Sequence, residues 1–166
     1  MSAESTAVPA NIVAPDSPVR TRTEVVWRGE RLFDAGPPGR THRIDAGAKE
    51  APGPVETLLN AIASCSAVDV IDIIGKRKTP VERMTVNVAA ERRSAFPRRV
   101  QRLEIEFRID GAGIEREHAE RAIQLSYERY CSVAASLASD IATETKLTLN
   151  GESFPAVKQK VWAPAV

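Results

Sequence analysis

Apolar residues dominate one segment near the middle of the chain, Pro54–Lys76, and they recur there at helical spacing. They cover most sides of the expected helix, a pattern that is typical of a buried helix. Proline at position 54 suits the first turn, because its missing N–H would be unpaired there in any case. We therefore expect one long helix that forms the centre of the core.

Shorter segments on both sides of this helix alternate apolar and polar residues, which predicts half-buried strands. The pattern predicts strands at 23–27, 31–34 and 41–45, a hairpin of strands at 84–90 and 103–109, and a last strand at 146–150. The first three strands are expected to form an antiparallel meander.

Two more helices are predicted between the hairpin and the last strand. The first covers Glu115–Tyr130, and its inward face is expected to hold Ala119, Ala122, Ile123, Ser126 and Tyr130. A shorter helix follows Cys131 and begins at about Ser132. The free N–H groups and the dipole of such a helix start favour negative charge, which is one way to lower the pKa of a thiol.

The two ends of the chain differ from the middle in composition. Proline and small polar residues indicate a flexible N-terminal arm at 1–20, followed by the domain at 21–152. Prolines 155 and 164 interrupt the C-terminal tail at 153–166, although Phe154 and Trp162 could dock on a neighbouring surface. The length of 166 residues fits one domain.

Charge and hydropathy exclude several classes of function. With 23 basic and 22 acidic residues, the chain has no basic excess for binding nucleic acid through its phosphates. It has no run of 18 apolar residues, so we expect no membrane segment, and no secretory signal is visible at the start. We expect a cytoplasmic protein whose two cysteines are reduced at rest.

Those two cysteines are the residues best suited to chemistry. Cys65 lies midway along the long helix, and packing is its alternative role, since free cysteine is often buried. Asp69 follows one turn later, and a nearby carboxylate disfavours a thiolate. Cys131 is placed at a break between helices, where packing is again an alternative. The spacing of cysteines and histidines matches no metal site, so we expect no metal.

Several segments of the chain resemble the OsmC/Ohr family. The resemblance covers roughly Thr23–Asn150 and follows the family's order of elements. It is carried by Ala51–Leu59 and Ala63–Val70 in the central helix, Glu91–Arg93 in the hairpin, and Ala119–Ser126 and Glu128–Val133 around the second cysteine.

The resemblance implies an α+β fold with antiparallel sheets around the long central helix. It also implies an intertwined homodimer with the long helices in its middle. It also implies reduction of a small hydrophobic peroxide as part of oxidative-stress defence, with Cys65 as the peroxidatic cysteine and Cys131 as the resolving cysteine. No bound cofactor is implied. The disulfide formed between the two cysteines would be reduced by an external dithiol of the lipoyl type.

One departure from the family pattern leaves a second interpretation open. Peroxidase members carry a glutamate directly after the proline that matches Pro54, and it holds an arginine over the thiolate. Here that position is Val55, and Glu56 is the nearest carboxylate. Arg28 and Arg43 resemble the placement of the arginine in different subgroups. The alternative is a non-catalytic dimeric stress or ligand-binding protein with packing cysteines.

Overall fold

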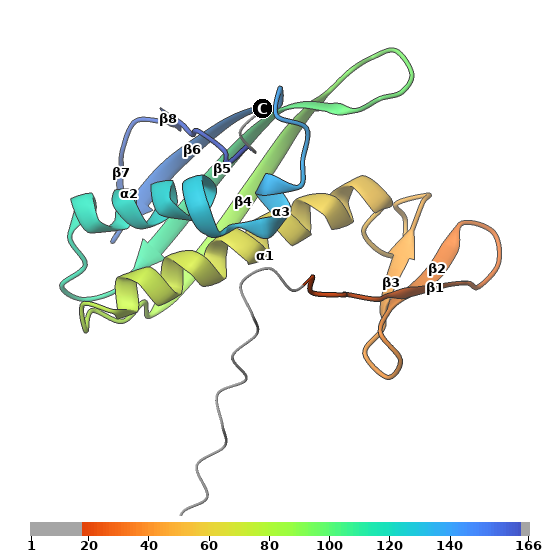
Figure 1. The fold of residues 1–166 in the computed structure, drawn as a ribbon, viewed down its shortest axis with the longest axis horizontal. Helices are drawn as coiled ribbons and strands as arrows, with labels where there is room; N and C mark the ends of the chain where they lie inside the picture. Colours follow the sequence, from red (N-terminus) through yellow and green to blue (C-terminus); the bar gives the residue numbers. More distant parts are fainter. Residues whose placement is uncertain (1–17, 164–166) are drawn as a thin grey trace, which may run out of the picture.

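The structure is a computed structural model that describes residues 18–163, so most of the arm expected at 1–20 lies outside the described residues. The chain forms a small sheet, a long helix, a larger sheet and a group of short helices (Figure 1). The elements are β1 (Glu24–Trp27), β2 (Leu32–Gly36), β3 (His42–Asp45), α1 (Pro54–Gly75), β4 (Arg83–Arg92), β5 (Val100–Asp110), α2 (Arg116–Leu125), η1 (Ser126–Tyr130), α3 (Ser132–Ala135), β6 (Ala142–Leu149), β7 (Glu152–Ser153) and β8 (Val157–Lys158).

The two sheets have different topologies. Strands β1, β2 and β3 form the expected antiparallel meander. In the larger sheet, β4 and β5 form an antiparallel hairpin, but β6 runs parallel to β5. The α+β fold is confirmed, whereas the expectation of antiparallel sheets is wrong for the β5–β6 pair. The reason is the crossover through α2, η1 and α3, which returns the chain to the starting end of β5 before β6 begins.

A buried carboxylate organises the loop that leads from β3 into α1. The side chain of Asp45 accepts hydrogen bonds from the backbone N–H groups of Gly47, Lys49 and Glu50 at 2.7, 2.8 and 3.0 Å. These bonds hold the pKa of the Asp45 carboxyl below its usual range. The loop thereby places the small sheet beyond the N-terminal end of α1 (Figure 1).

Helix α1 has one buried face and one exposed face. Its inner face consists of four fully buried residues, Ile62, Ser66, Val70 and Ile74. The opposite face exposes Leu58, Val68 and Ile71, and the Val68 side chain is 52% exposed. The expectation of a helix buried on most sides is therefore wrong for the single chain.

The apolar character of α1 also meets a simple criterion for crossing a membrane. Its mean hydropathy is 1.6 over 18 residues. The central helix of a folded domain meets the same criterion, and the inner face of α1 packs in the core. This feature is therefore weak evidence for a membrane segment.

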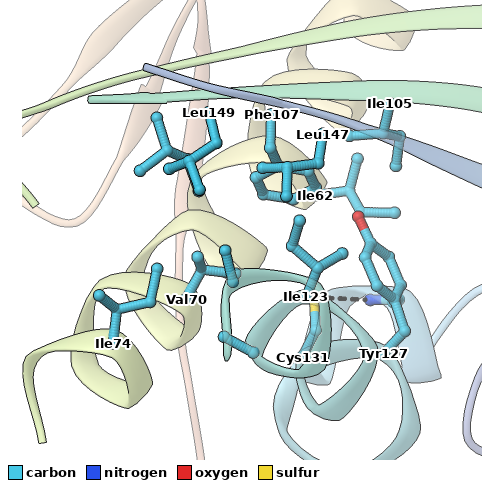
Figure 2. Packing of buried hydrophobic residues seen from close by; sticks show 14 of the residues in the cluster. Ile62, Val70, Ile74, Ile105, Phe107, Ile123, Tyr127, Cys131, Leu147 and Leu149 are labelled. Carbon is cyan, nitrogen blue, oxygen red and sulfur yellow. Dashed lines mark hydrogen bonds between the residues drawn. The ribbon is translucent and has the colours of Figure 1, made fainter. Parts of the chain in front are cut away.

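The core lies between the larger sheet and the helical layer (Figure 2). Phe107, from the middle of β5, is fully buried there. Figure 2 shows Ile62, Val70 and Ile74 of α1 below the strands, with Ile123, Tyr127 and Cys131 from the segment after β5 beside them. Besides Phe107, the buried apolar strand residues of this layer are Val100, Leu103, Ile105, Ile109, Leu147 and Leu149.

The helix predicted at Glu115–Tyr130 changes its winding near its end. It is an α-helix to Leu125 and continues as a π-helical turn over Ser126–Tyr130. The wider turn changes which side chains face the core. Tyr127 is buried and Tyr130 is exposed, so the prediction that Tyr130 points inward is wrong.

The first part of the C-terminal tail packs on its own domain. Strand β8 pairs with β6, and the backbone N–H of Trp162 donates to the Tyr127 carbonyl at 2.9 Å. Phe154 packs against the core, and the Arg116 guanidinium lies over its ring at 4.2 Å. The tail therefore covers part of the layer that holds Tyr127.

The core assignment predicts a large difference between two phenylalanines. Replacing Phe107, which is fully buried, with alanine should lower the free energy of unfolding by about 3–5 kcal/mol, because it removes buried apolar surface and leaves a cavity. Phe96 is 81% exposed, so Phe96→Ala should change stability by less than about 0.5 kcal/mol. Urea denaturation of both variants measures this difference, and equal losses would contradict the packing described here.

Candidate functional site

Cys65 lies midway along α1, at the border between its two faces. Its side chain is half-buried and packs against the core cluster. The exposed residues Ser64 and Val68 lie beside it on the outer face. The thiol is therefore attached to a rigid helix, with its inner side against the core and its outer side close to the surface.

Cys131 connects the π-helical turn to α3. Its backbone N–H donates to the Ser126 carbonyl at 2.8 Å, and this bond spans five residues, as in a π-helix. The side chain is 2% exposed, and its Sγ accepts a hydrogen bond from the Ala134 N–H at 3.4 Å (Figure 2). Cys131 thus forms the N-cap of α3 and buries its thiol in the core.

The packing of η1 and α3 on α1 brings the two thiols together. The Cys65 side chain is close enough to Cys131 to raise the pKa of the Cys131 thiol. Both cysteines are free, since no disulfide joins them in the structure. The fold therefore places side by side two residues that are far apart in the sequence.

Burial determines the protonation of Cys131. It raises the pKa of this thiol from 9.0 to about 12. The hydrogen bond from the Ala134 N–H favours the thiolate form of Cys131, whereas Cys65 and Asp69 disfavour this form. Each of these effects on the pKa is smaller than the effect of burial. The predicted helix start at Ser132 is confirmed, but it does not lower the pKa overall, because a helix of four residues supplies few free N–H groups to a fully desolvated sulfur.

A carboxylate lies next to the two thiols. Asp69 follows Cys65 by one turn of α1, and its Oδ2 accepts a hydrogen bond from the Ser126 hydroxyl at 2.8 Å. The Asp69 charge also raises the pKa values of Cys131 and Tyr127, which places it near both side chains. Ser126 and the π-helical turn give this carboxylate a defined position.

Glu56 does not lie near Cys65. Its Oε2 accepts a hydrogen bond from the Gly53 N–H at 2.7 Å, so it caps the start of α1. The spacing between Glu56 and Cys65 along the chain also places the two residues on different sides of an ideal helix. The carboxylate thus stabilises the helix that carries the thiol.

The two candidate arginines pair with one aspartate on the small sheet. Arg28 Nε and Arg43 Nε each lie 2.7 Å from a different oxygen of Asp34. Both arginines hold the pKa of this carboxyl below its usual range. The small sheet stands beyond the N-terminal end of α1 (Figure 1), whereas Cys65 lies midway along this helix.

The described surface offers several grooves, and neither cysteine lines the two described next. One groove, with a volume of about 380 Å³, lies between α2 and the β8 region and is lined by residues such as Arg121, Gln124 and Lys158. Another, of about 540 Å³, lies beside the first half of α1.

Among residues 18–163, no group of three or more His, Cys, Asp or Glu side chains is arranged to hold a metal ion.

The burial of Cys131 predicts a selective alkylation pattern. The thiolate is the reactive form, so a thiol pKa of about 12 should make Cys131 react with iodoacetamide at pH 9 at least ~100-fold more slowly in the folded protein than in the unfolded one. Cys65 should be modified first. Peptide mass spectrometry with and without denaturant measures both rates, and rapid labelling of folded Cys131 would contradict the burial described here.

The profile of the OsmC-like protein family matches residues 47–146, which include α1, the hairpin and the whole of the segment around Cys131. The protein YhfA of Escherichia coli K12 is 38% identical over 88 residues. This match covers 53% of the present chain and 66% of YhfA, slightly less than two thirds of that relative.

Solved structures share the same architecture. A hypothetical protein from Aquifex aeolicus VF5 is 25% identical, with a TM-score of 0.69 over 80% of this chain and 98% of that one. The organic hydroperoxide resistance protein OhrB of Bacillus subtilis is 12% identical, with a TM-score of 0.54 over 77% of this chain and 98% of that one, and this likeness concerns the fold alone. With its family match over residues 47–146 and this shared fold, the chain belongs to the OsmC-like protein family.

Proposed function

We propose that this protein reduces organic hydroperoxides by thiol chemistry, with Cys65 as the attacking residue and Cys131 as the resolving residue. The observation that carries this proposal is the placement of the two thiols next to each other in the core of an OsmC-like domain. The family and the printed function of OhrB, organic hydroperoxide resistance, support a stress-related role.

The proposed reaction begins at the more accessible thiol. The Cys65 thiolate attacks one oxygen of the hydroperoxide, the O–O bond breaks, and the alcohol leaves while the sulfur becomes a sulfenic acid. The Cys131 sulfur then attacks the Cys65 sulfur, and water leaves as the disulfide forms. This sequence transfers two electrons from the thiols to the peroxide.

An external dithiol would return the two cysteines to the reduced state. Thiol–disulfide exchange supplies the two electrons, and a lipoyl group is the reductant suggested by the family resemblance. The proposal needs no bound cofactor. It fits a cytoplasmic setting, where thiols are kept reduced between turnovers.

We further propose that the protein acts as a homodimer formed through α1. The face of α1 with Leu58, Val68 and Ile71 is apolar and exposed in the single chain, and a second copy could cover it. Cys65 lies at the border of this face, so the partner could close an apolar site over the thiol. It could also bring Arg28 or Arg43 from its small sheet towards Cys65.

A non-catalytic stress or ligand-binding protein remains the second candidate. It is favoured by the Cys131 thiol, which burial holds protonated, and by Val55 in the position of the family glutamate. In this alternative, the two cysteines are packing residues and do not turn over.

Peroxide treatment distinguishes the two candidates. One equivalent of cumene hydroperoxide should convert the reduced protein to an intramolecular Cys65–Cys131 disulfide, seen as the loss of two hydrogens in the intact mass. Cys65→Ser should abolish the reaction. Cys131→Ser should leave a sulfenic acid at Cys65 that a dimedone probe traps. Two free thiols after excess peroxide would favour the packing role.

A charged substitution on the exposed face of α1 tests the proposed homodimer. Val68→Asp should convert a dimer to monomers at micromolar concentration, because it buries a charge in an apolar interface. Val157→Asp is the matched control, since Val157 on β8 is 50% exposed and lies off α1. Light scattering gives the masses. A wild-type monomer, or a dimer that tolerates Val68→Asp, would contradict an interface through α1.

A further inference from the structure

The resolving step requires Cys131 to lose a proton inside the core. Its thiol is 2% exposed, so bulk water has little access to it. Burial also keeps this thiol protonated at neutral pH. A fast resolving step therefore needs a proton acceptor that is already in place next to the thiols.

Asp69 is connected to both cysteines through the fold. It shares α1 with Cys65 and lies one turn further along the helix. Ser126 links it to Cys131: the Ser126 hydroxyl donates to Asp69 Oδ2 at 2.8 Å, and the Ser126 carbonyl accepts the Cys131 N–H at 2.8 Å. The π-helical turn thereby fixes the carboxylate and the resolving residue in one arrangement.

The other titratable groups around Asp69 are less suited to this role. Tyr127 is buried, and burial raises the pKa of its hydroxyl, so it stays neutral. Glu128 pairs with Arg121 and Gln124 at 3.4 and 2.8 Å. Asp72, the next carboxylate on α1, is exposed to solvent. Among residues 18–163, no lysine, arginine or histidine forms an ion pair with Asp69, so no fixed cation competes for its charge.

We propose that Asp69, held by Ser126, is the proton acceptor for Cys131 when this residue attacks the oxidised sulfur of Cys65. This inference rests on the proposed two-cysteine function. The Cys131 S–H bond breaks, its proton passes to the Asp69 carboxylate, and a Cys65–Cys131 bond forms. The group bound to the Cys65 sulfur leaves. In the peroxide reaction it is the hydroxyl of the sulfenic acid, which departs as water with the proton that Asp69 gives up, so the carboxylate is restored.

The negative charge of Asp69, taken alone, would slow the attack by Cys131 on the Cys65 sulfur. Its negative charge disfavours the Cys131 thiolate. If Asp69 acted only through this charge, its neutralisation would speed up the attack by Cys131. If Asp69 accepts the proton, its neutralisation slows the attack, so the sign of the effect separates the two roles.

The test uses an activated disulfide in place of peroxide. Dithiobis-nitrobenzoate reacts with the more accessible Cys65 and releases one thionitrobenzoate, and attack by Cys131 then releases a second. We expect Asp69→Asn to slow the second release at pH 7 by about 100-fold, the lower end of the range for general base catalysis. Asparagine can still accept the Ser126 hydrogen bond, so the packing is retained.

The pH profile gives a readout that a structural role would not change. The wild-type rate of the second release should depend only weakly on pH around neutrality, whereas the Asp69→Asn rate should rise about tenfold per pH unit, because hydroxide becomes the acceptor. Ser126→Ala should slow the second release less than Asp69→Asn does. Asp72→Asn removes the same charge from the exposed face of α1, and its second release should be as fast as in the wild type.

A second release that is as fast as in the wild type, or faster, in Asp69→Asn would overturn the inference. Thermal unfolding of each variant shows that the fold is retained. Because no peroxide takes part, this result is independent of hydroperoxide reduction. A protein that fails to reduce cumene hydroperoxide yet shows the expected slowing would contradict the proposed function alone.

Discussion

The contact between the inner face of α1 and the segment after α2 is the interaction on which the rest of the structure depends. Ile62, Ser66, Val70 and Ile74 are buried along this face. The same contact brings Tyr127 and Cys131 under the larger sheet and next to Cys65. Apolar packing of this kind is dense and resists rearrangement, so it can hold two sulfur atoms close without a bond between them.

The chemistry of the site follows from the depth of that packing. Cys65 is half-buried on a rigid helix, whereas Cys131 is fully buried at a turn between two short helical segments. An accessible thiol can meet a substrate, and a protected thiol is available only to its neighbour. The carboxylate of Asp69 lies at the same contact, tied to the π-helical turn by Ser126.

Much of this architecture could be predicted from the sequence, because the local signals were strong. The apolar run and Pro54 predicted α1 within one residue at each end, and alternation predicted the β4–β5 hairpin. The last strand was predicted to begin at Lys146, but β6 begins at Ala142, because its alternating polar residues are threonines and a glutamate that give a weak apolar signal. The parallel pairing of β5 and β6 depends on the path of the crossover, which no local pattern encodes.

The candidate site was predicted only in part, for a similar reason. Both cysteines could be singled out from their contexts, but the π-helical turn that aligns Ser126 with Asp69 has no sequence signature. The pKa of Cys131 depends on burial, a property of the whole core, and burial outweighs the helix start next to it. Glu56 and the two arginines have local partners, Gly53 and Asp34, that sequence spacing did not indicate.

We propose that Cys65 and Cys131 act as one redox pair. A titration of the protein in dithiothreitol buffers of graded potential, with the two thiols counted by intact mass after acid quenching and alkylation, tests it most directly. We expect a single two-electron transition between two free thiols and an internal Cys65–Cys131 disulfide. Two thiols that stay free in the most oxidising buffer, or disulfides that join different molecules, would contradict it.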